Sequence, residues 1–549
     1  MGENPHCRHT GNSWTRTVSF PRSSGILLHP TSLPGPFGIG DLGPVAYEFA
    51  DFLADSGQSI WQMLPLGPTG YGDSPYQCFS AFAGNPALIS LSRLADEGLL
   101  DARDIDALPE FSREQVEYER VNQFKQGKLS KAFAEFRSGA PQHRQQEFAQ
   151  FVEAERDWLA DYALFRALKD KVGGVAWPKW DPELVSRKPA AVQRARKELA
   201  LQIGEQEFLQ FVFFEQWNSL KEYCGQKRIH MMGDLPIYVA HDSADVWAQP
   251  EYFHLDSHGG PTKVAGVPPD YFSATGQLWG NPIYHWQRMA ADEYSWWIKR
   301  FRAAFSMFDM LRVDHFRGFE AYWEVPAGER TAQNGKWVKG PGAELFAVLE
   351  AKLECLPILA ENLGVITPEV EAIRERFGFP GMAILQFAFG NDPQGPSFRP
   401  HNYPRNLVAY TGTHDNDTVI GWWTSKPGEG SIRTEEDIRK ERQFTRTYLG
   451  YDDTGISEPI NWVFIRSLMA SVADTVVFPL QDVLGEGAQA RMNVPGTATG
   501  NWRWRFRGER LTEDIASRLR KIASISAASR FMSAITPANH FPPAPGERF

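Results

Sequence analysis

Cysteine, long apolar runs and clusters of basic residues are all scarce in this sequence of 549 residues. Its four cysteines show no CxxC or Cys/His spacing, which argues against a disulfide framework and against a structural zinc site. No apolar run is long enough to span a bilayer, and the first twenty residues lack the apolar centre of a secretory signal. The net charge of −10 and the lack of a basic run argue against nucleic acid as a partner. We therefore expect a cytoplasmic protein with no nucleic-acid or membrane partner, and the oligomeric state stays open.

The first residues stand apart from the rest of the chain. Residues 1–21 are poor in acidic side chains, so a short transit-like segment is one interpretation. A disordered tail or an over-extended start is the interpretation that we prefer, because the segment is short. We predict a disordered tail over 1–21 and a folded catalytic unit over 22–549.

Short apolar segments alternate with helical patterns along the remainder of the chain. The segments are nearly continuous in apolar character, which is typical of strands covered on both faces of a parallel sheet. Amphipathic helical periodicity occurs at Val45–Leu53, Leu345–Leu353 and Ile460–Leu468, and residues 367–369 (Thr-Pro-Glu) form the clearest helix start. Eight strands alternating with helices predict an α/β fold, a (β/α)8 TIM barrel. The eight strand segments centre near Ile26, Met63, Met232, Leu311, Leu359, Leu385, Ala409 and Val477.

Two connections are too long for simple barrel loops. The interval between the second and third strands carries a charged, helical pattern, which predicts a large, mainly helical insertion over 85–222. The interval between the third and fourth strands is rich in Gly, Pro and aromatic residues. Long irregular loops in compact domains are usually functional or disordered, and this aromatic content argues against disorder. We therefore predict an active-site loop subdomain over 240–300, beside the mouth of the barrel.

Acidic residues gather at the carboxyl ends of four predicted strands, where barrel enzymes carry their reacting groups. A single acid at a strand end more often caps a helix or pairs with an arginine, and Arg312 and Arg317 offer Asp314 such a partner. Four converging acids would repel one another and raise at least one pKa, so their convergence favours a functional site over a structural one. The four acids are Asp234, Asp314, Glu361 and Asp415.

Several blocks of the sequence resemble one enzyme family, the 4-α-glucanotransferases of the amylomaltase or disproportionating-enzyme type, glycoside hydrolase family seventy-seven. The resemblance runs from about Arg22 to about Arg505 and keeps the order of the blocks. It implies transfer of α-1,4-glucan segments to acceptor glucans or glucose by a retaining double displacement. We expect no cofactor, and we expect no metal because no paired ligand spacing indicates one. The implied partners are α-1,4-glucans and maltooligosaccharides. The similar blocks are SGILLHPTSLPGPFGIGDLG, GDSPYQ, GDLPIYVAHDSADVW, GQLWGNP, MLRVDHFRG, AENLG, GTHDND and RMNVPGTATGNWRWR.

The resemblance also implies roles for individual residues. Asp314 in RVDHF is similar to the family's nucleophile, Glu361 in AENLG to its general acid/base, and Asp415 in GTHDND to its transition-state stabiliser. Substrate binding is implied for Tyr76, Ser74, Asp234, Gln277, Trp279, Arg312, His414 and Asn493.

Elementary electrostatics agrees with two of these roles. Retention requires one ionised and one protonated carboxyl group, about 5–5.5 Å apart. Arg312 lies two residues before Asp314 on the same strand face, so we expect its charge to keep Asp314 ionised. Glu361 follows three apolar residues, so we expect burial and the nearby anion to raise its pKa.

Aromatic residues in the loop after strand three favour transfer over hydrolysis, because rings that cover the groove exclude water and bind the acceptor. Packing inside the insertion is the alternative interpretation of these rings. An α-glucan hydrolase of the amylase kind and a catalytically silent glucan-binding protein are the alternative functions. The aromatic residues are Tyr271, Phe272, Trp279, Tyr284 and Trp286.

Overall fold

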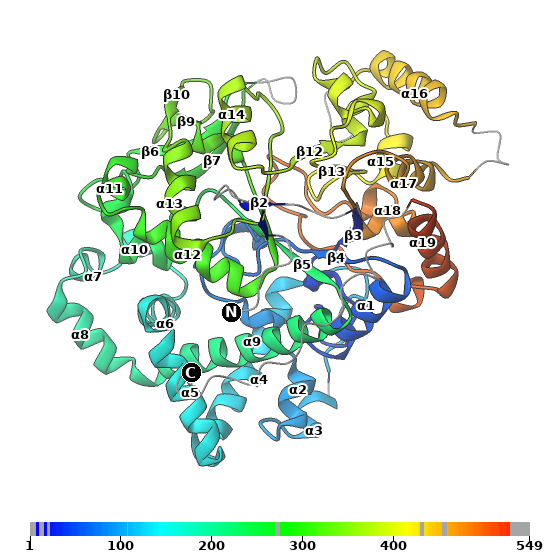
Figure 1. The fold of residues 1–549 in the computed structure, drawn as a ribbon. Coiled ribbons are helices and arrows are strands. Elements are labelled where there is room, and N and C mark those ends of the chain that lie inside the picture. The colour runs from blue at the N-terminus through cyan, green and yellow to red at the C-terminus, as the bar shows by residue number, and fades with distance from the viewer. Residues whose placement is uncertain are drawn as a thin grey trace.

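Eight parallel strands form the central sheet of the protein in a computed structural model (Figure 1). The structure describes residues 7–9, 16–18, 22–106, 108–269, 275–428, 433–452 and 458–526. The strand order is β11-β8-β5-β4-β3-β14-β13-β12. In chain order the strands are β3 (Ser23–Leu27), β4 (Ile60–Gln62), β5 (His230–Leu235), β8 (Met310–Val313), β11 (Ile358–Ala360), β12 (Gly381–Ile384), β13 (Leu407–Tyr410) and β14 (Thr475–Pro479).

The two edges of this sheet meet, so the sheet is nearly closed. The backbone N–H of Ala360, at the end of β11, donates to the carbonyl of Pro380 just before β12 (3.0 Å). The N–H of Met382 in β12 donates to the side-chain oxygen of Asn362 (2.8 Å). The predicted (β/α)8 barrel is confirmed, and each of the eight predicted segments contains or adjoins one of its strands.

Burial on both faces explains the apolar character of the strands. Every residue of β8, β11, β12, β13 and β14 is buried. Strands pack so closely that a Cβ added at Gly25 of β3 would lie 2.4 Å from Ile60 of β4, and only glycine fits there. The barrel interior is therefore a packed core, which leaves its carboxyl-terminal mouth as the place for a site.

Helices cover the outside of the barrel between its strands. The periodic segments near residues 45, 345, 367 and 460 are confirmed as α1, α13, α14 and α17. Helix α14 begins at Pro368 as predicted, although the preceding Thr367 hydroxyl makes no capping hydrogen bond. The covering helices are α1 (Pro44–Asp55), α12 (Ser295–Met307), α13 (Ala343–Leu353), α14 (Pro368–Arg376), α15 (Val419–Thr424), α16 (Glu435–Leu449), α17 (Ile460–Met469), α18 (Leu480–Leu484) and α19 (Glu513–Ile525).

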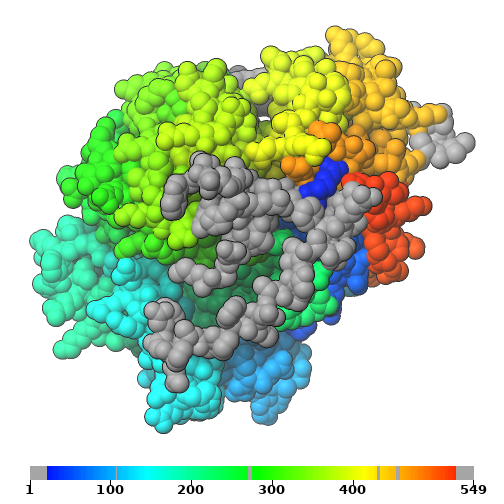
Figure 2. Space-filling model, in the orientation of Figure 1, coloured from blue at the N-terminus to red at the C-terminus, as the bar shows by residue number. Residues whose placement is uncertain are grey.

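The long interval between β4 and β5 is helical, and its helices form the lower part of the face seen in Figure 2. Helix α9 runs for 27 residues and packs against α6, where the Phe214 ring contacts the Trp158 ring. The domain limits at 85 and 222 stay a prediction. The helices are α2 (Leu91–Asp96), α3 (Ala102–Asp106), α4 (Tyr118–Gly139), α5 (Gln142–Ala154), α6 (Arg156–Lys171), α7 (Pro182–Val185), α8 (Pro189–Glu198) and α9 (Ala200–Gln226).

A second, four-stranded antiparallel sheet lies beside the barrel mouth, with the order β10-β9-β6-β7 (Figure 1). Strands β6 (Lys263–Val267) and β7 (Gln277–Pro282) come from the connection after β5, together with α10 (Ala244–Ala248) and α11 (Trp286–Ala291). Strands β9 (Ala321–Pro326) and β10 (Lys336–Lys339) come from the connection after β8. The subdomain predicted over 240–300 therefore shares its sheet with a loop that the sequence analysis did not include.

Three further expectations concern the ends and the cysteines. Short strands β1 (Cys7–His9) and β2 (Arg16–Val18) pair with each other, and the rest of the predicted tail lies outside the described residues. Within the described part of the chain, no helix has the length and apolar character needed to cross a membrane. Cys78 and Cys224 carry free thiols, whereas Cys355 is disulfide-bonded, so the chain has a disulfide although its cysteine spacing indicates no disulfide framework.

Candidate active site

Asp314 and Glu361 follow neighbouring strands at the same level of the barrel mouth. Val313 and Ala360 are register partners in the parallel pair β8 and β11, and each acid is the next residue. The N–H of Glu361 donates to the carbonyl of Val313 (3.1 Å), and the N–H of Asp314 donates to that of Leu235 in β5 (3.0 Å). Regular pairing therefore continues to the acids and fixes both at one rim of the barrel.

The guanidinium group of Arg312 joins Asp314 to Asp234. One nitrogen lies 2.9 Å from a carboxylate oxygen of Asp314, and the other lies 2.7 Å from one of Asp234. Arg312 and Asp234 are register partners on β8 and β5, so their side chains project from the same face of the sheet. The side chains of Arg312 and Asp234 are 5% and 0% exposed, which makes this a buried charge-assisted pair.

The pKa of Asp314 differs from the expectation. Burial raises it to about 6, and the charges of Asp234 and Asp415 add to that rise. Arg312 and His414 oppose the shift but do not overcome it. Arg312 therefore contacts Asp314 as expected, yet the pKa of Asp314 is raised rather than lowered, so the carboxylate is ionised at pH 7 by a narrow margin.

The carboxyl group of Glu361 is buried and held by the backbone. One oxygen accepts from the N–H of His315 (2.8 Å) and the other from the N–H of Leu363 (3.0 Å). Burial raises the pKa of Glu361 to about 7; the charge of Arg312 opposes this rise, and the Asp314 anion adds to it. The direction and two of the causes are those expected from the sequence, and Glu361 keeps its proton to a higher pH than Asp314.

Tyr76 links Asp234 to His414. Its hydroxyl donates to the Asp234 carboxylate (2.8 Å) and is hydrogen-bonded to Nε2 of His414 (2.9 Å). The Tyr76 and His414 rings stack with centroids 5.2 Å apart, and Trp502 lies close to both. Ser74 stabilises the backbone of this loop, because its hydroxyl accepts a hydrogen bond from the N–H of Tyr76 (3.2 Å).

Asp415 stands at the rim beside Asn493. The Asn493 amide donates to the Asp415 carboxylate (2.6 Å), and His414 Nε2 lies 3.4 Å from the same oxygen. The Asp415 side chain is 46% exposed, so it faces the open mouth. Arg491 donates to the Asp415 backbone carbonyl (2.7 Å), which fixes the main chain at this point.

Strand β7 brings Gln277 and Trp279 to the opposite side. The Trp279 indole N–H donates to the Gln277 amide oxygen (3.3 Å). The Trp279 ring meets the edge of His315 with centroids 4.8 Å apart, and the His315 backbone binds Glu361. All eleven residues singled out by the sequence therefore lie in one connected set of contacts at the mouth.

The aromatic residues expected to cover the groove are divided between the mouth and the core of the insertion. Tyr284 and Trp286 are buried and pack on Trp297, so their rings belong to the core of the insertion and cannot stack on a sugar. Trp279 does lie at the mouth. Tyr271 and Phe272 fall outside the described residues.

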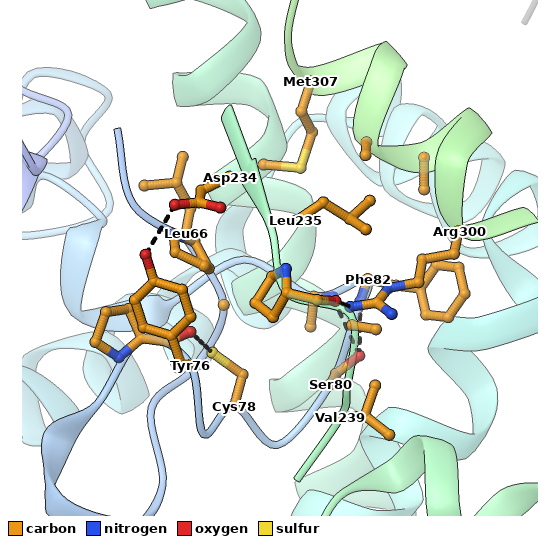
Figure 3. A pocket seen from close by; sticks show the side chains of 18 of the residues that line it. Leu66, Tyr76, Cys78, Ser80, Phe82, Asp234, Leu235, Val239, Arg300 and Met307 are labelled. Atoms are coloured by element: carbon orange, nitrogen blue, oxygen red, sulfur yellow. Dashed lines mark hydrogen bonds between the residues drawn. The ribbon is translucent and has the colours of Figure 1, made fainter. Parts of the chain in front are cut away.

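A cavity of about 90 Å³ lies behind Tyr76 and Asp234 (Figure 3). Leu235 and Met307 line it, and so does Cys78, whose thiol donates to the Pro75 carbonyl (3.0 Å). Burial raises the pKa of the Cys78 thiol to about 12, so the thiol is neutral. Asp234 lines this cavity, so the largely apolar lining keeps its surroundings low in polarity and strengthens its ion pair with Arg312.

Two further residues at the mouth escaped the sequence analysis. His29 follows β3 and is buried near His414, and burial lowers its pKa to about 3, so it is neutral. Asp482, after β14, binds both ends of the loop that carries Asp415: it accepts from the Thr411 hydroxyl (2.6 Å) and from the Val419 N–H (2.7 Å). Both residues follow strands, so the rule that located the four acids would also have found them.

This fold and its cluster of carboxyl groups define the class of protein: a (β/α)8-barrel enzyme with its acids at the carboxyl-terminal mouth. The chain belongs to the 4-alpha-glucanotransferase family, whose sequence pattern matches residues 28–512. The family resemblance, the barrel and the 4-α-glucanotransferase activity expected from the sequence are therefore confirmed.

Individual relatives are similar over nearly their whole length. The chain is 52% identical to a 4-alpha-glucanotransferase from Synechocystis sp. over 507 residues, which covers 92% of this chain and 97% of the relative. It is 49% identical to the enzyme of that name from Thermus thermophilus, covering 92% and 99%. Among solved structures, an amylomaltase from Streptococcus agalactiae in complex with acarbose has a TM-score of 0.87 at 40% identity, covering 92% of this chain and 99% of that one.

Proposed function

We propose that this enzyme transfers α-1,4-glucan segments by double displacement, with Asp314 as the nucleophile and Glu361 as the general acid/base. The observation that carries the proposal is the pair of carboxyl groups on adjacent strands with different proton affinities. At neutral pH the Asp314 carboxylate is ionised and a large fraction of Glu361 is protonated, which are the states that retention requires.

In the first half of the reaction, the Asp314 carboxylate attacks the anomeric carbon of the donor sugar. The bond from that carbon to the glycosidic oxygen breaks, and Glu361 gives its proton to the leaving oxygen. The product is a β-glucosyl ester on Asp314 and a shortened glucan with a free hydroxyl.

In the second half, the hydroxyl of an incoming glucan attacks the same carbon. The Glu361 carboxylate takes the proton of that hydroxyl, and the ester bond to Asp314 breaks. Each carboxyl group returns to its starting state, and one glycosidic bond replaces another without net consumption of water.

The surrounding residues stabilise the charge that develops on the sugar. Asp415, which faces the mouth, accepts hydrogen bonds from sugar hydroxyls as the ring becomes oxocarbenium-like. The positive charge of Arg312, which contacts both carboxylates, offsets the repulsion between Asp314 and Asp234. Sugar binding along the groove is assigned to Tyr76, Ser74, Asp234, Gln277, Trp279, Arg312, His414 and Asn493.

The partners of this chemistry are α-1,4-glucans and maltooligosaccharides, and the reaction needs no cofactor. The acarbose complex of the Streptococcus agalactiae amylomaltase supports a ligand of this kind. We further propose that the enzyme acts in the cytoplasm, and the low cysteine content of the chain supports this location.

Incubation with maltotriose tests the proposal. Transfer yields glucose and a ladder of longer chains while the number of reducing ends stays constant. An amylase-like hydrolase would instead make the reducing ends climb, and a silent glucan-binding protein would form no products. Either result would overturn the proposed reaction.

A further inference from the structure

Trp337 on the edge strand β10 differs from the other tryptophans that the structure describes. Its side chain is 38% exposed, and it is the only tryptophan among the exposed large apolar side chains of the described residues. A tryptophan ring that is held in a fixed orientation with one face open offers a large flat apolar surface on which a ligand can stack.

Two neighbours hold the Trp337 ring in place. The guanidinium carbon of Arg317 lies 3.7 Å from the ring centroid and so covers one face. Trp323, the register partner on β9, contacts an edge at 5.2 Å with the planes at 69°. Trp323 is itself fixed, because its indole N–H donates to the carbonyl of Ala332 (2.8 Å). The second face of Trp337 meets no other ring or cation of the described residues.

Arg317 also ties this ring to the mouth of the barrel. It lies three residues after Asp314, and its guanidinium group donates to the carbonyl of Val365, in the loop that follows Glu361. Val365 is 55% exposed, so the loop that Arg317 contacts lies at the surface. Trp337 therefore stands on the Glu361 side of the mouth.

The Glu361 side is the side of the leaving and incoming glucan in the proposed reaction, because a general acid faces the oxygen that it protonates. A chain of more than a few sugars at that position extends out of the mouth over the rim. The apolar faces of glucose units stack on flat aromatic rings, and an exposed lysine beside Trp337 supplies donors for hydroxyl groups. This residue is Lys339, which lies on the same face of β10 as Trp337 and pairs with Glu320 while 75% of its side chain stays exposed.

We propose that the open face of Trp337 is an outer binding site for long α-1,4-glucans, on the acceptor side of the cleft. The inference rests on the proposed function for its direction, although binding at this ring needs no turnover. The site selects for chain length, because short maltooligosaccharides fill the mouth without reaching the ring.

The test compares W337A and W337F with the unmodified enzyme in two assays. In native gels that contain soluble starch, W337A should lose retardation, with an apparent dissociation constant about threefold to tenfold weaker, the equivalent of one aromatic stacking contact. In turnover assays, KM for long amylose should rise by a similar factor while maltotriose disproportionation stays unchanged. W337F retains a ring face and should restore most of the binding.

A matched control removes exposed apolar surface at the other end of the barrel. Val472, 52% exposed and just before β14, lies at the amino-terminal end of the strands, so V472A should leave both assays unchanged. Unchanged starch retardation and unchanged KM for amylose in W337A would overturn the site. So would loss of self-association in W337A in sedimentation, because Trp337 would then be an interface between copies. Failure of the unmodified enzyme to disproportionate maltotriose would instead refute the proposed function.

Discussion

Asp314 and Glu361 end adjacent parallel strands at one level, yet Glu361 holds its proton more strongly. Burial raises the pKa of Glu361 to about 7 and that of Asp314 to about 6. Among the residues that the structure describes, no cation forms an ion pair with Glu361 as Arg312 does with Asp314, and the two Glu361 oxygens accept the backbone N–H groups of His315 and Leu363. The difference supports the proposed roles, in which Asp314 attacks the sugar and Glu361 transfers the proton.

The pH dependence of kcat/KM on maltotriose should be bell-shaped with a narrow optimum between about pH 6 and pH 7. Below the lower limit the Asp314 nucleophile becomes protonated, and above the upper limit Glu361 loses the proton that it must donate. Initial rates from pH 4.5 to pH 9 measure the two limbs. Activity that stays constant up to pH 9 would contradict the role of Glu361.

The variants D314N and E361Q should each lose nearly all turnover while keeping the fold. Both side chains are close in size to the originals, and the amides can neither attack nor exchange a proton. Product formation from maltotriose and far-ultraviolet circular dichroism give the two measurements. If either variant retains more than a few per cent of activity with a native spectrum, its assigned role is wrong.

E361Q should also change how stability depends on pH. The pKa of Glu361 rises on folding from 4.5 to about 7, so the folded state binds this proton more tightly than the unfolded state does. The tighter proton binding stabilises the fold in full below pH 4.5, and the stabilisation is lost as the pH rises through 7. Glutamine carries no charge to bury, so the unfolding free energy of E361Q relative to the unmodified enzyme should increase by about 2–3 kcal/mol between pH 4 and pH 8. Urea denaturation at the two pH values measures it, and a constant difference would contradict the burial of this charge.

Asp482 should act as a positioning residue for Asp415. It binds Thr411 and Val419, the two ends of the Asp415 loop, so D482N leaves one of these donors facing an amide N–H. We expect a loss of about 1–3 kcal/mol in stability together with a fall in kcat of about tenfold or more and little change in KM.

The matched control for D482N is D245N. Asp245 is also a buried carboxylate whose pKa burial raises to about 6, and it accepts the N–H of Ala81 (2.8 Å) away from the Asp415 loop. D245N should lose comparable stability and keep kcat. Equal kcat values in D482N and D245N at a temperature where both are folded would show that Asp482 supports the fold alone.

The sequence predicts the barrel and its site well because both follow from local rules. Near-continuous apolar segments mark strands buried on both faces, and the residue after each strand lies at the mouth, which is how Asp314 and Glu361 are located. The family blocks then supply residues such as Ser74 and Asn493, which no pattern of spacing indicates.

The features that the sequence does not predict depend on contacts between distant segments. Strands β6 and β9 pair across two separate loops, so neither loop alone shows a sheet pattern. The same reason hides the bond between Asp482 and Thr411, which are 71 residues apart. The raised pKa of Asp314 could not be predicted either, because burial raises it more than the charge of Arg312 lowers it. The residues next to Asp314 in the sequence do not show how deeply its side chain is buried.

The pairing of β6 with β9 makes one plate out of the connections that follow β5 and β8. One edge of this plate carries Trp279 and the other carries Trp337, so the two rings are fixed relative to each other across four strands. Neither of the two connections can move by itself without breaking the hydrogen bonds between β6 and β9. The distance between the two rings is thus set by strand geometry, so the proposed outer site stays at a constant separation from the residues of the inner groove.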